Sequence, residues 1–439
     1  MLDDDSHHGE GAERIHVRVA ASEVLVHVLR GCGLGHGSSI VTRGCPESLW
    51  LSRGGEPPMG SGVSPSNTIH RCPLRWVPDE HPRPGEGTRP SMSVTFEVIE
   101  SGSTTTADTE GHRPAVSVIL PVYNAAEDIE SAISKLEEVT LRDDLEIIVV
   151  DDGSTDDTLG RLRAVQTDLH VKVLALAANG GVARARNIAI TRATGDYVWM
   201  IDADDDWTSD GLERMLAAAK AYDAEIVIAR ATKLVLSSGE RLPVSCPKPG
   251  AYNREQAVEL ILKGDLKGHL WNKLFRRSLL VADQFPPLRT KSDYFGVINA
   301  VASATKVAVL ADDVYTYKYR LGSITNRSIS TPMDLLRCGE RALAVAESVL
   351  PGGPKPVDVS KFLYGAIFQI ALAETWRFGS KAVSGELVQA YARGVISLPG
   401  ILQLAKAKHL REASFGAAVK FAPSVVKKLY VARRAKRWT

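Results

Sequence analysis

The chain has 439 residues, of which 44% are apolar and 24% are charged, and its formal net charge is +1. This composition is typical of a globular protein with room for more than one domain, and the balanced charge argues against a nucleic-acid partner. The five cysteines lack the spacing of a metal site, so we expect free thiols. No uninterrupted apolar run of about 18 residues occurs, and we therefore expect no transmembrane helix.

Residues 1–112 differ in composition from the rest of the chain. They are rich in Gly, Pro, Ser, His and Arg, as in RGGEPPMGSGVSPSN and DEHPRPGEGTRPS. Such a segment buries too little apolar surface to offset the entropy lost on ordering. We expect it to be disordered or a spurious N-terminal extension, with the functional chain starting at Met92. The acidic, His-rich first residues do not have the pattern of a signal peptide.

From residue 115 onward, short apolar runs alternate with helical patterns. The runs are at 115–123, 145–152, 171–177, 197–201 and 224–230, and the helical patterns between them are at 127–139, 153–165, 182–193 and 211–222. Continuous apolar strands that alternate with helices indicate βαβ units and a parallel sheet covered on both faces. The sequence therefore predicts an α/β fold.

The remainder of the chain becomes increasingly helical. Residues 250–330 are mixed, with helices expected near 253–263 and 293–304 and a strand near 306–311. Beyond 331 the apolar spacing is helical, and Pro/Gly breaks separate the segments. We predict a 113–325 α/β domain and a 326–439 helical C-terminal region that ends in a basic tail.

Unusual polar residues follow the predicted strands one after another. Pro121, Tyr123 and Asn124 follow the first strand, and Asp152 follows the second. The third strand is followed by Asn179-Gly180-Gly181, and the fourth by the aspartates of MIDADDDW (200–207). Because ligands of an open parallel sheet bind at the carboxyl ends of its strands, these residues predict one site.

The aspartate cluster predicts a metal-bridged phosphate. No GxGxxG turn or GxxxxGK[ST] loop is present, so phosphate needs another means of binding. Carboxylates bind phosphate through a divalent cation, and hard oxygen ligands suit Mn²⁺ or Mg²⁺. We therefore expect Asp202 and Asp204 to bridge a metal to a diphosphate.

Two other interpretations of the cluster are open to argument. An EF-hand loop would place Asp202, Asp204, Asp206 and Glu213 at its positions 1, 3, 5 and 12. Position 6, normally glycine, is Trp207, and the preceding residues have a strand pattern, so this interpretation is disfavoured. An exposed acidic turn before the next helix accounts for Asp206 but poorly for the Asp-x-Asp pair.

Four segments in order carry a family resemblance: VSVILPVYNAAEDIESAI, EIIVVDDGSTDDT, NGGVARARNIAITRATGDYVWMIDADDDW and LWNKLFRRSLL. Over about residues 115–325 they resemble family 2 glycosyltransferases of the GT-A fold. The resemblance implies a Rossmann-like, mainly parallel sheet flanked by helices. It also implies an inverting transfer that uses a nucleotide-diphosphate sugar and a divalent metal.

The resemblance further implies roles for individual residues. Asp204 would bind the metal, Asp202 the metal-bound diphosphate or the ribose, and Asp205 is a neighbouring candidate ligand. The nucleotide sugar would contact a larger set of residues. Among them, Tyr123 and Pro121 would line the base pocket, and Asp152 would accept a hydrogen bond from the base. The whole predicted nucleotide-sugar set is Pro121, Tyr123, Asn124, Asp152, Asn179, Gly181, Arg186, Asn187 and Asp202.

The catalytic base of the family usually comes from a Glu-Asp pair at the start of a helix. The matching stretch is LRTKSDYFGVINA, so the resemblance implies Asp293 as the base. Ser292 stands where the family usually has glutamate, which leaves an alternative open. In that alternative, the protein is a catalytically inactive nucleotide-sugar or glycan-binding protein with the same fold. Trp271 is expected either to pack or to contact the acceptor, and His269 is a candidate for the metal site or the acceptor pocket.

Taken with the resemblance, the sequence predicts a metal-dependent, inverting hexosyl- or N-acetylhexosaminyltransferase. The favoured donor is a UDP-sugar, and the acceptor is a hydroxyl of a glycan or lipid-linked glycan in cell-surface polysaccharide synthesis. We expect it to act in the cytoplasm, with a possible peripheral position on an anionic membrane. That possibility rests on a tail with no acidic residue, whose basic residues are Lys427, Lys428, Arg433, Arg434, Lys436 and Arg437.

Overall fold

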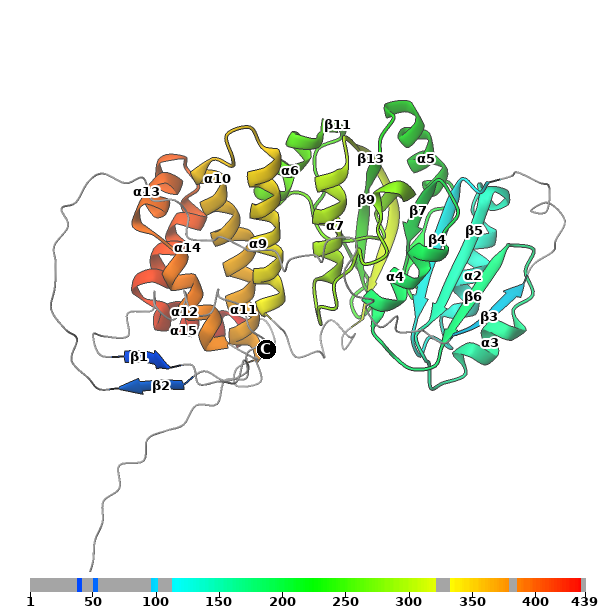
Figure 1. Cartoon of the computed structure of the whole chain (residues 1–439), viewed down its shortest axis with the longest axis horizontal. Helices are drawn as coiled ribbons and strands as arrows, with labels where there is room; N and C mark the ends of the chain where they lie inside the picture. The colour runs from blue at the N-terminus through cyan, green and yellow to red at the C-terminus, as the bar shows by residue number, and fades with distance from the viewer. Residues whose placement is uncertain are drawn as a thin grey trace, which may run out of the picture. The chain divides into compact units, whose positions relative to one another are not determined.

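The structure is a computed structural model that describes residues 38–41, 50–53, 96–101, 113–320, 332–378 and 385–435. The chain divides into two compact units, Met1–Glu80 and His81–Thr439. In the first unit, the described residues form an antiparallel pair of strands, β1 (Ser38–Val41) and β2 (Trp50–Arg53). All other described elements belong to the second unit (Figure 1).

Four adjacent parallel strands form the centre of the second unit. In their order across the sheet they are β7 (Tyr197–Met200), β4 (Val116–Val122), β5 (Leu145–Asp151) and β6 (Val171–Leu176). Every residue of β5 and β7 is buried, which explains why these strands are continuously apolar in sequence.

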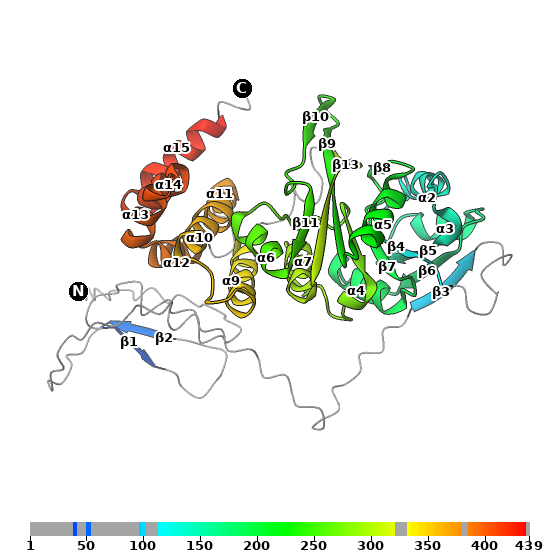
Figure 2. The same ribbon diagram turned by 90° about the horizontal axis from the view of Figure 1, so that it is seen from above.

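The helices that follow these strands along the chain lie on both faces of the sheet. They are α2 (Ile129–Glu137), α3 (Thr158–Ala164), α4 (Val182–Arg192) and α5 (Gly211–Tyr222). The chain moves outward from β4 to β6 and then returns to β7 beside β4. Right-handed crossovers therefore place α4 on the opposite face from α2, as Figure 2 shows. The reversal beside β4 is the point where such sheets open a ligand site.

The remaining strands extend this sheet on both sides. On one side, β3 (Phe96–Ser101) pairs antiparallel with β6. On the other, β12 (Lys273–Arg276) runs antiparallel between β7 and β9 (Ile226–Val235), and β13 (Lys306–Tyr319) is parallel to β9. Three short antiparallel strands complete the described sheet: β8 (Asp206–Trp207), β10 (Glu240–Pro243) and β11 (Gly250–Asn253).

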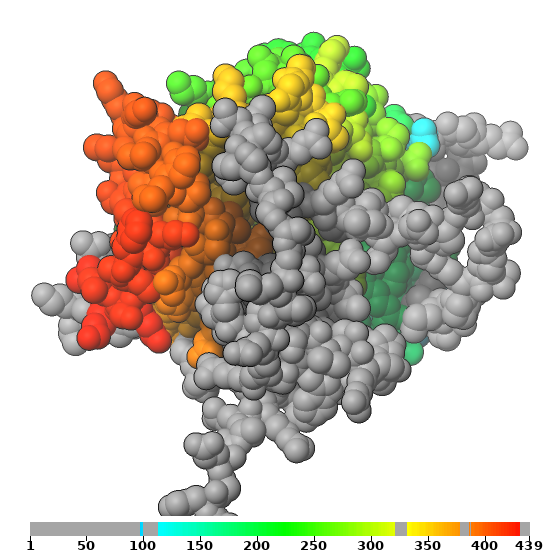
Figure 3. Space-filling view, turned by 60° about the vertical axis from the view of Figure 1, so that its left-hand side comes forward, coloured from blue at the N-terminus to red at the C-terminus, as the bar shows by residue number. Residues whose placement is uncertain are grey.

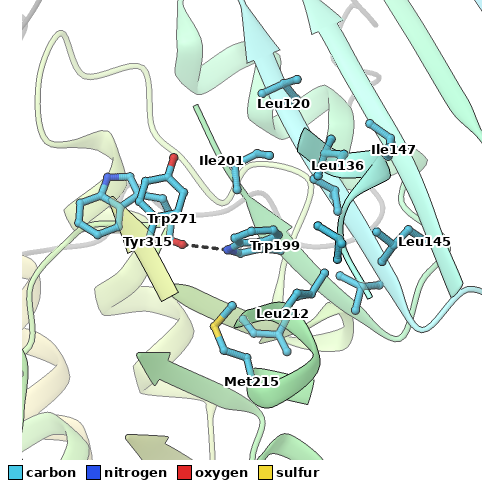
Figure 4. Packing of buried hydrophobic residues seen from close by; sticks show 14 of the residues in the cluster. Leu120, Leu136, Leu145, Ile147, Trp199, Ile201, Leu212, Met215, Trp271 and Tyr315 are labelled. Atoms are coloured by element: carbon cyan, nitrogen blue, oxygen red, sulfur yellow. Dashed lines mark hydrogen bonds between the residues drawn. The ribbon is translucent and has the colours of Figure 1, made fainter. Parts of the chain in front are cut away.

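An aromatic cluster anchors the core where β7, β8 and β13 meet (Figure 4). Trp199, on β7, donates its indole N–H to the carbonyl oxygen of Trp271 at 2.8 Å. The Trp271 ring stacks on Tyr315 with ring centroids 4.9 Å apart, and Tyr315 also meets the edge of Trp199. Because buried aromatic rings contribute large apolar areas and fixed geometry, this cluster stabilises the sheet directly beneath the aspartates that follow β7.

The C-terminal region is a set of helices that packs on the α/β part. Its elements are α9 (Pro332–Val349), α10 (Pro356–Lys361), the π-helical segment η3 (Phe362–Phe368), α11 (Gln369–Phe378), α12 (Gly385–Val395), α13 (Leu398–Lys406), α14 (Leu410–Phe421) and α15 (Pro423–Ala435). Helix α9 contacts α6 (Arg254–Lys263) and α7 (Ser292–Ser303). None of the helices in the described part of the chain is long and apolar enough to cross a bilayer.

The predicted fold class is confirmed, because a mainly parallel sheet flanked by helices is followed by a helical C-terminal region. The expectation of disorder through residue 112 is wrong for 96–101, where β3 satisfies its backbone hydrogen bonds along the edge of β6. The rest of 1–112, apart from the β1 and β2 residues, lies outside the described residues. Within the region beyond 331 that the sequence predicts to be helical, α10 and α11 are joined by the π-helical segment η3.

Candidate functional site

The residues predicted from the strand ends meet at one rim of the sheet. The loops after β4, β5 and β7 lie next to one another because these strands are parallel neighbours, and the loop before α4 joins them. Tyr123 is 43% exposed at this rim, and Pro121 is partly buried beside it. The rim thus offers an exposed aromatic ring beside loops rich in polar groups.

Asn124 joins the loops that follow β4 and β5. Its backbone is left-handed, with φ of 52°, and its N–H donates to Ser154 Oγ at 2.9 Å. Its Oδ1 accepts the N–H of Thr155 at 2.8 Å. The side chain predicted to contact nucleotide therefore holds the loop after β5 in place in this structure.

Asp152 joins the loop after β5 to the start of α4. Its side chain is buried, and its two oxygens accept the N–H groups of Gly180 at 2.9 Å and Gly181 at 2.7 Å. Gly153, with φ of +68°, lies so close that a Cβ there would be 2.7 Å from the backbone of Asn179. Asn179 itself is exposed at the rim.

Arg186 places a partly buried cation next to the first aspartate of the cluster. Its Nη2 lies 3.2 Å from Asp202 Oδ1, and its Nε has no hydrogen-bond partner among the described residues. The neighbouring Asn187 instead exchanges two hydrogen bonds with the backbone of Phe285, at 2.8 and 3.0 Å. Arg186 therefore faces the site, whereas Asn187 fastens α4 to the segment before α7.

Asp205 points away from the rim into the aromatic cluster. It is fully buried, Tyr315 donates its hydroxyl to Oδ2 at 2.9 Å, and the Lys318 N–H donates to Oδ1 at 2.8 Å. Burial, followed by the nearby Asp202 charge, raises the pKa of Asp205 to about 8. The same Tyr315 oxygen accepts the N–H of Asp202 at 3.2 Å, so this pair fixes the turn.

Asp204 and Asp206 lie in contrasting electrostatic surroundings. Burial and then the neighbouring carboxylates of Asp202 and Asp128 raise the pKa of Asp204. Asp206 is also partly buried, but hydrogen bonds from Lys135 and Lys318 outweigh that burial and lower its pKa. Asp204 is thus a carboxylate with excess negative charge around it, and Asp206 is neutralised by two lysines.

The donor set fits a metal that is shared with a substrate. In the described ranges, no group of three or more His, Cys, Asp or Glu side chains is arranged to hold a metal ion. Asp202 and Asp204 nevertheless place two carboxylates together, and Mn²⁺ or Mg²⁺ commonly takes one or two such ligands plus phosphate and water. Burial, followed by the neighbouring carboxylates, raises the pKa of Asp204, and a divalent cation bound there would favour the charged form of this carboxylate.

The EF-hand interpretation is wrong. Trp207 lies in strand β8 and pairs with Tyr315, so the chain does not form a calcium-binding turn there. Glu213 lies on α5, where its Oε2 accepts the Thr140 hydroxyl at 2.9 Å.

Asp293 lies in the first turn of α7, on the segment that follows β12. Its Oδ1 accepts the N–H of Tyr294 at 2.8 Å, and its side chain is partly buried. Ser292 beside it is only 5% exposed, so the position where the family usually has glutamate is inside the protein. A Cβ on Gly268 would lie 2.6 Å from Tyr294 Cα, which places residues 268–269 against this helix start.

The His269–Lys273 segment packs within the protein. The His269 ring stacks on Trp271 at 4.6 Å, and burial followed by the charges of Lys273 and Lys267 lowers the pKa of His269 to about 3. Lys273 is 1% exposed, and its Nζ donates to His269 O at 2.5 Å and to Asn272 Oδ1 at 3.0 Å. Burial lowers the pKa of Lys273 to about 7. The packing role expected for Trp271 therefore has direct support.

Several residues that shape the site were missed by the sequence analysis. Tyr315 fixes the aspartate turn, Lys135 and Lys318 neutralise Asp206, and Arg320 pairs with Asp128 at 2.9 Å. The alternating tyrosines of VYTYKY are a strand pattern with one aromatic face, which is a usable signal for Tyr315. No signal in the sequence connects the lysines to Asp206.

Comparison with known proteins agrees with this arrangement. Residues 117–280 match the family model described as Glycosyl transferase family 2. The putative glycosyltransferase EpsH of Bacillus subtilis is 30% identical over 49% of this chain and 63% of its own length. The poly(ribitol-phosphate) beta-N-acetylglucosaminyltransferase TarS of Staphylococcus aureus is 29% identical over 46% of this chain and 35% of its own length. The chain thus spans less than two thirds of the length of these relatives.

Solved structures share the fold. The crystal structure of S. aureus TarS 1–349 in complex with UDP-GlcNAc is 22% identical, with a TM-score of 0.51 over 70% of this chain and 90% of that one. The structure of TarS 1–349 alone has a TM-score of 0.53. The family match and these likenesses show that residues 117–280 form a domain of glycosyl transferase family 2, and that the chain shares the fold of the TarS structures.

Proposed function

We propose that this protein transfers a sugar, with inversion, from a nucleotide-diphosphate donor to a hydroxyl of a glycan or lipid-linked glycan. A UDP-sugar is the favoured donor, because the TarS structure of similar fold holds UDP-GlcNAc. A cell-surface polymer is the favoured acceptor class. Its support is that TarS and the poly(ribitol-phosphate) beta-glucosyltransferase of Bacillus spizizenii, 32% identical over 46% of this chain, are named for a polymer, poly(ribitol-phosphate).

The convergence of Tyr123, Asp152, Arg186 and Asp202 on one rim is the observation that carries the proposal. Tyr123 presents an exposed ring on which a base can stack, and the buried Asp152 donates its N–H to the carbonyl oxygen of the adjacent Val122 at 2.8 Å. Each carboxylate oxygen of Asp152 accepts one backbone N–H and keeps a further lone pair, so it can also accept a base N–H. Arg186 adds a cation whose Nε has no hydrogen-bond partner among the described residues, which suits it to the diphosphate.

Asp202 and Asp204 are the residues that would hold the divalent metal in this proposal. When bound, the metal supplies positive charge that stabilises the diphosphate as it leaves the sugar. Asp205 is a weak candidate ligand, because both its oxygens already accept hydrogen bonds within the aromatic cluster. Near Asp202 and Asp204, Arg320 forms an ion pair with Asp128 and so offsets part of the negative charge around the proposed metal ligands.

Asp293 is the proposed general base. It lies in the first turn of α7, on a different element from the proposed donor residues. As base it takes the acceptor proton while that oxygen attacks the anomeric carbon and the nucleotide diphosphate departs from the opposite side. The buried Ser292 beside it makes no comparable contribution, so the proposal assigns proton transfer to Asp293 alone.

The test measures nucleotide release from a panel of donors, with and without Mn²⁺. Asp293→Asn should spare donor binding and lower turnover by about two orders of magnitude or more, which is the usual effect of losing a general base. Asp283→Asn, an exposed aspartate before the same helix, is the matched control and should keep wild-type turnover. Near-normal turnover in Asp293→Asn would show that another residue is the base. Donor binding without release in every condition would instead favour the inactive binding protein.

A further inference from the structure

Helices α13, α14 and α15 expose an unusual number of large apolar side chains. Leu398 and Leu402 on α13 are 55% and 58% exposed, and Leu410 at the start of α14 is 63% exposed. Phe421, Val425 and Leu429, at four-residue intervals along α14 and α15, are 65%, 55% and 58% exposed. Their helices form the orange-to-red part of the surface in Figure 3, and we call these six residues, with the cations among them, the C-terminal surface.

These exposed residues are not the packing faces of their helices. The packing faces are formed by other residues, such as Leu404 on α13 and Val419 on α14, which are buried. On α15, the Tyr430 ring meets Trp376 of α11 at 5.6 Å, so this helix is docked through a different side from Leu429. Each helix thus has a partner in the fold and a second apolar side that remains in solvent.

Positive charge accompanies the exposed apolar groups. Between residues 398 and 430 there is a single acidic residue, Glu412, whereas the whole chain has a net charge of only +1. The cations of the same segment are Lys406, Lys408, Arg411, Lys420, Lys427 and Lys428. Apolar side chains mixed with cations are the pattern that binds the interface of an anionic bilayer.

We propose that the C-terminal surface attaches the protein to the face of a bilayer that contains anionic lipid. A second copy of the chain is a poorer occupant, because two such surfaces would bring like charges together. Nucleic acid is also poorer, because aliphatic leucine and valine side chains offer nothing to phosphates and little to bases, which stack on aromatic rings. On an anionic bilayer, the leucines can insert among the lipid chains and the lysines can contact the lipid phosphates. This occupant therefore accounts for both the exposed apolar side chains and the cations.

Vesicle sedimentation of the full chain tests the proposal. The protein should pellet with vesicles of equal parts phosphatidylcholine and phosphatidylglycerol, much less with phosphatidylcholine alone, and less at high salt. Lys427→Gln/Lys428→Gln should lower the partition coefficient about 25-fold, since each lysine near an anionic surface changes it about fivefold. Leu398→Ser/Leu402→Ser should also lower it, including at low salt.

Matched controls keep the experiment specific to this surface. Lys220→Gln/Lys263→Gln removes two exposed lysines from α5 and α6, and Leu236→Ser/Leu242→Ser removes two exposed leucines near β10; both should bind like wild type. The proposal is overturned if wild type does not pellet with the mixed vesicles, or if the controls lose as much binding as the C-terminal variants. Concentration-dependent dimerisation or oligonucleotide binding that the C-terminal variants abolish, without vesicle binding, also overturns it. Because nucleotide release is measured without membranes, failure here leaves the proposed transfer reaction intact.

Discussion

Asp204 and Asp205 are adjacent in sequence but face opposite surroundings. The two carboxylate oxygens of Asp205 accept hydrogen bonds from the Tyr315 hydroxyl and the Lys318 N–H. Asp204, in contrast, is partly buried near the negative charges of Asp202 and Asp128. An asparagine at 205 can keep both contacts, since its amide oxygen accepts and its NH₂ donates. An asparagine at 204 removes charge from the proposed metal site. The two positions therefore separate a structural role from a binding role.

We expect Asp204→Asn to abolish the Mn²⁺-dependent rise in thermal stability that a nucleotide-sugar donor produces, because ligand binding to the native state raises its apparent stability. Asp205→Asn should retain most of that rise and should fold normally. Thermal unfolding with donor alone, Mn²⁺ alone and both together measures this. Loss of the effect in Asp205→Asn, with retention in Asp204→Asn, would reverse the assignment.

The free energy of unfolding should depend on pH through His269, whose ring stacks on Trp271. Its pKa of about 3 means that the folded protein keeps the ring neutral, whereas the unfolded chain takes up a proton near pH 6.5. The stability it provides is therefore present above pH 6.5 and is lost as pH falls toward 3, by at most about 1.4 kcal/mol per pH unit. His269→Gln should flatten the acid side of a plot of unfolding free energy against pH. The exposed His170→Gln, just before β6, should leave the curve unchanged.

At the scale of elements, the loops after β5 and β6 depend on one close backbone contact. Gly153 has φ of +68°, and a Cβ there would lie 2.7 Å from Ala178 C and Asn179 N. Any side chain would push the Asn179–Gly181 loop away from Asp152, which holds that loop through two hydrogen bonds. The geometry of the proposed base pocket therefore depends on a glycine that makes no ligand contact of its own.

Gly153→Ala should raise the KM for the donor and destabilise the fold by about 1–3 kcal/mol, as expected for strained left-handed backbone with a clash. Gly239→Ala is the control, because Gly239 has φ of +70° but a Cβ added to it would meet nothing within 4 Å. That variant should show the backbone strain without a change in KM. Equal KM values in the two variants would mean that the loop contact does not shape the donor site.

The elements differ in how well the sequence predicts them. The parallel strands and their helices follow from local patterns, because each buried strand is a continuous apolar run. Strands β8, β10, β11 and β12 are too short for such a pattern and form by pairing with the longer strands β9 and β13 and, for β12, also with β7. The site divides in the same way: strand-end aspartates are visible in sequence, but the direction of Asp205 is set by Tyr315, 110 residues away. The individual roles of the predicted donor and metal residues remain predictions.

At the scale of the whole molecule, the C-terminal helices brace the segment that carries Asp293. Asp334, on α9, is 6% exposed and accepts the Thr290 N–H at 3.0 Å, just before α7 begins. Nearby, Cys338 Sγ lies 3.5 Å from the Lys291 carbonyl oxygen, and Arg341 donates to Asn299 at 2.7 Å. Helix α9 thus holds both the start and the outer side of α7.

Asp334→Ala should lower kcat more than it raises the donor KM, because it frees the backbone before the proposed base and leaves the donor rim intact. Loss of the buried acceptor should also destabilise the fold by about 1–3 kcal/mol. Steady-state kinetics with a saturating acceptor, together with thermal unfolding, measures both effects. Glu386→Ala, an exposed acid on α12, is the control and should change neither. A folded Asp334→Ala protein with unchanged kcat would show that α7 keeps its position without this contact from α9. A rise in donor KM as large as the fall in kcat would instead place the effect at the nucleotide rim.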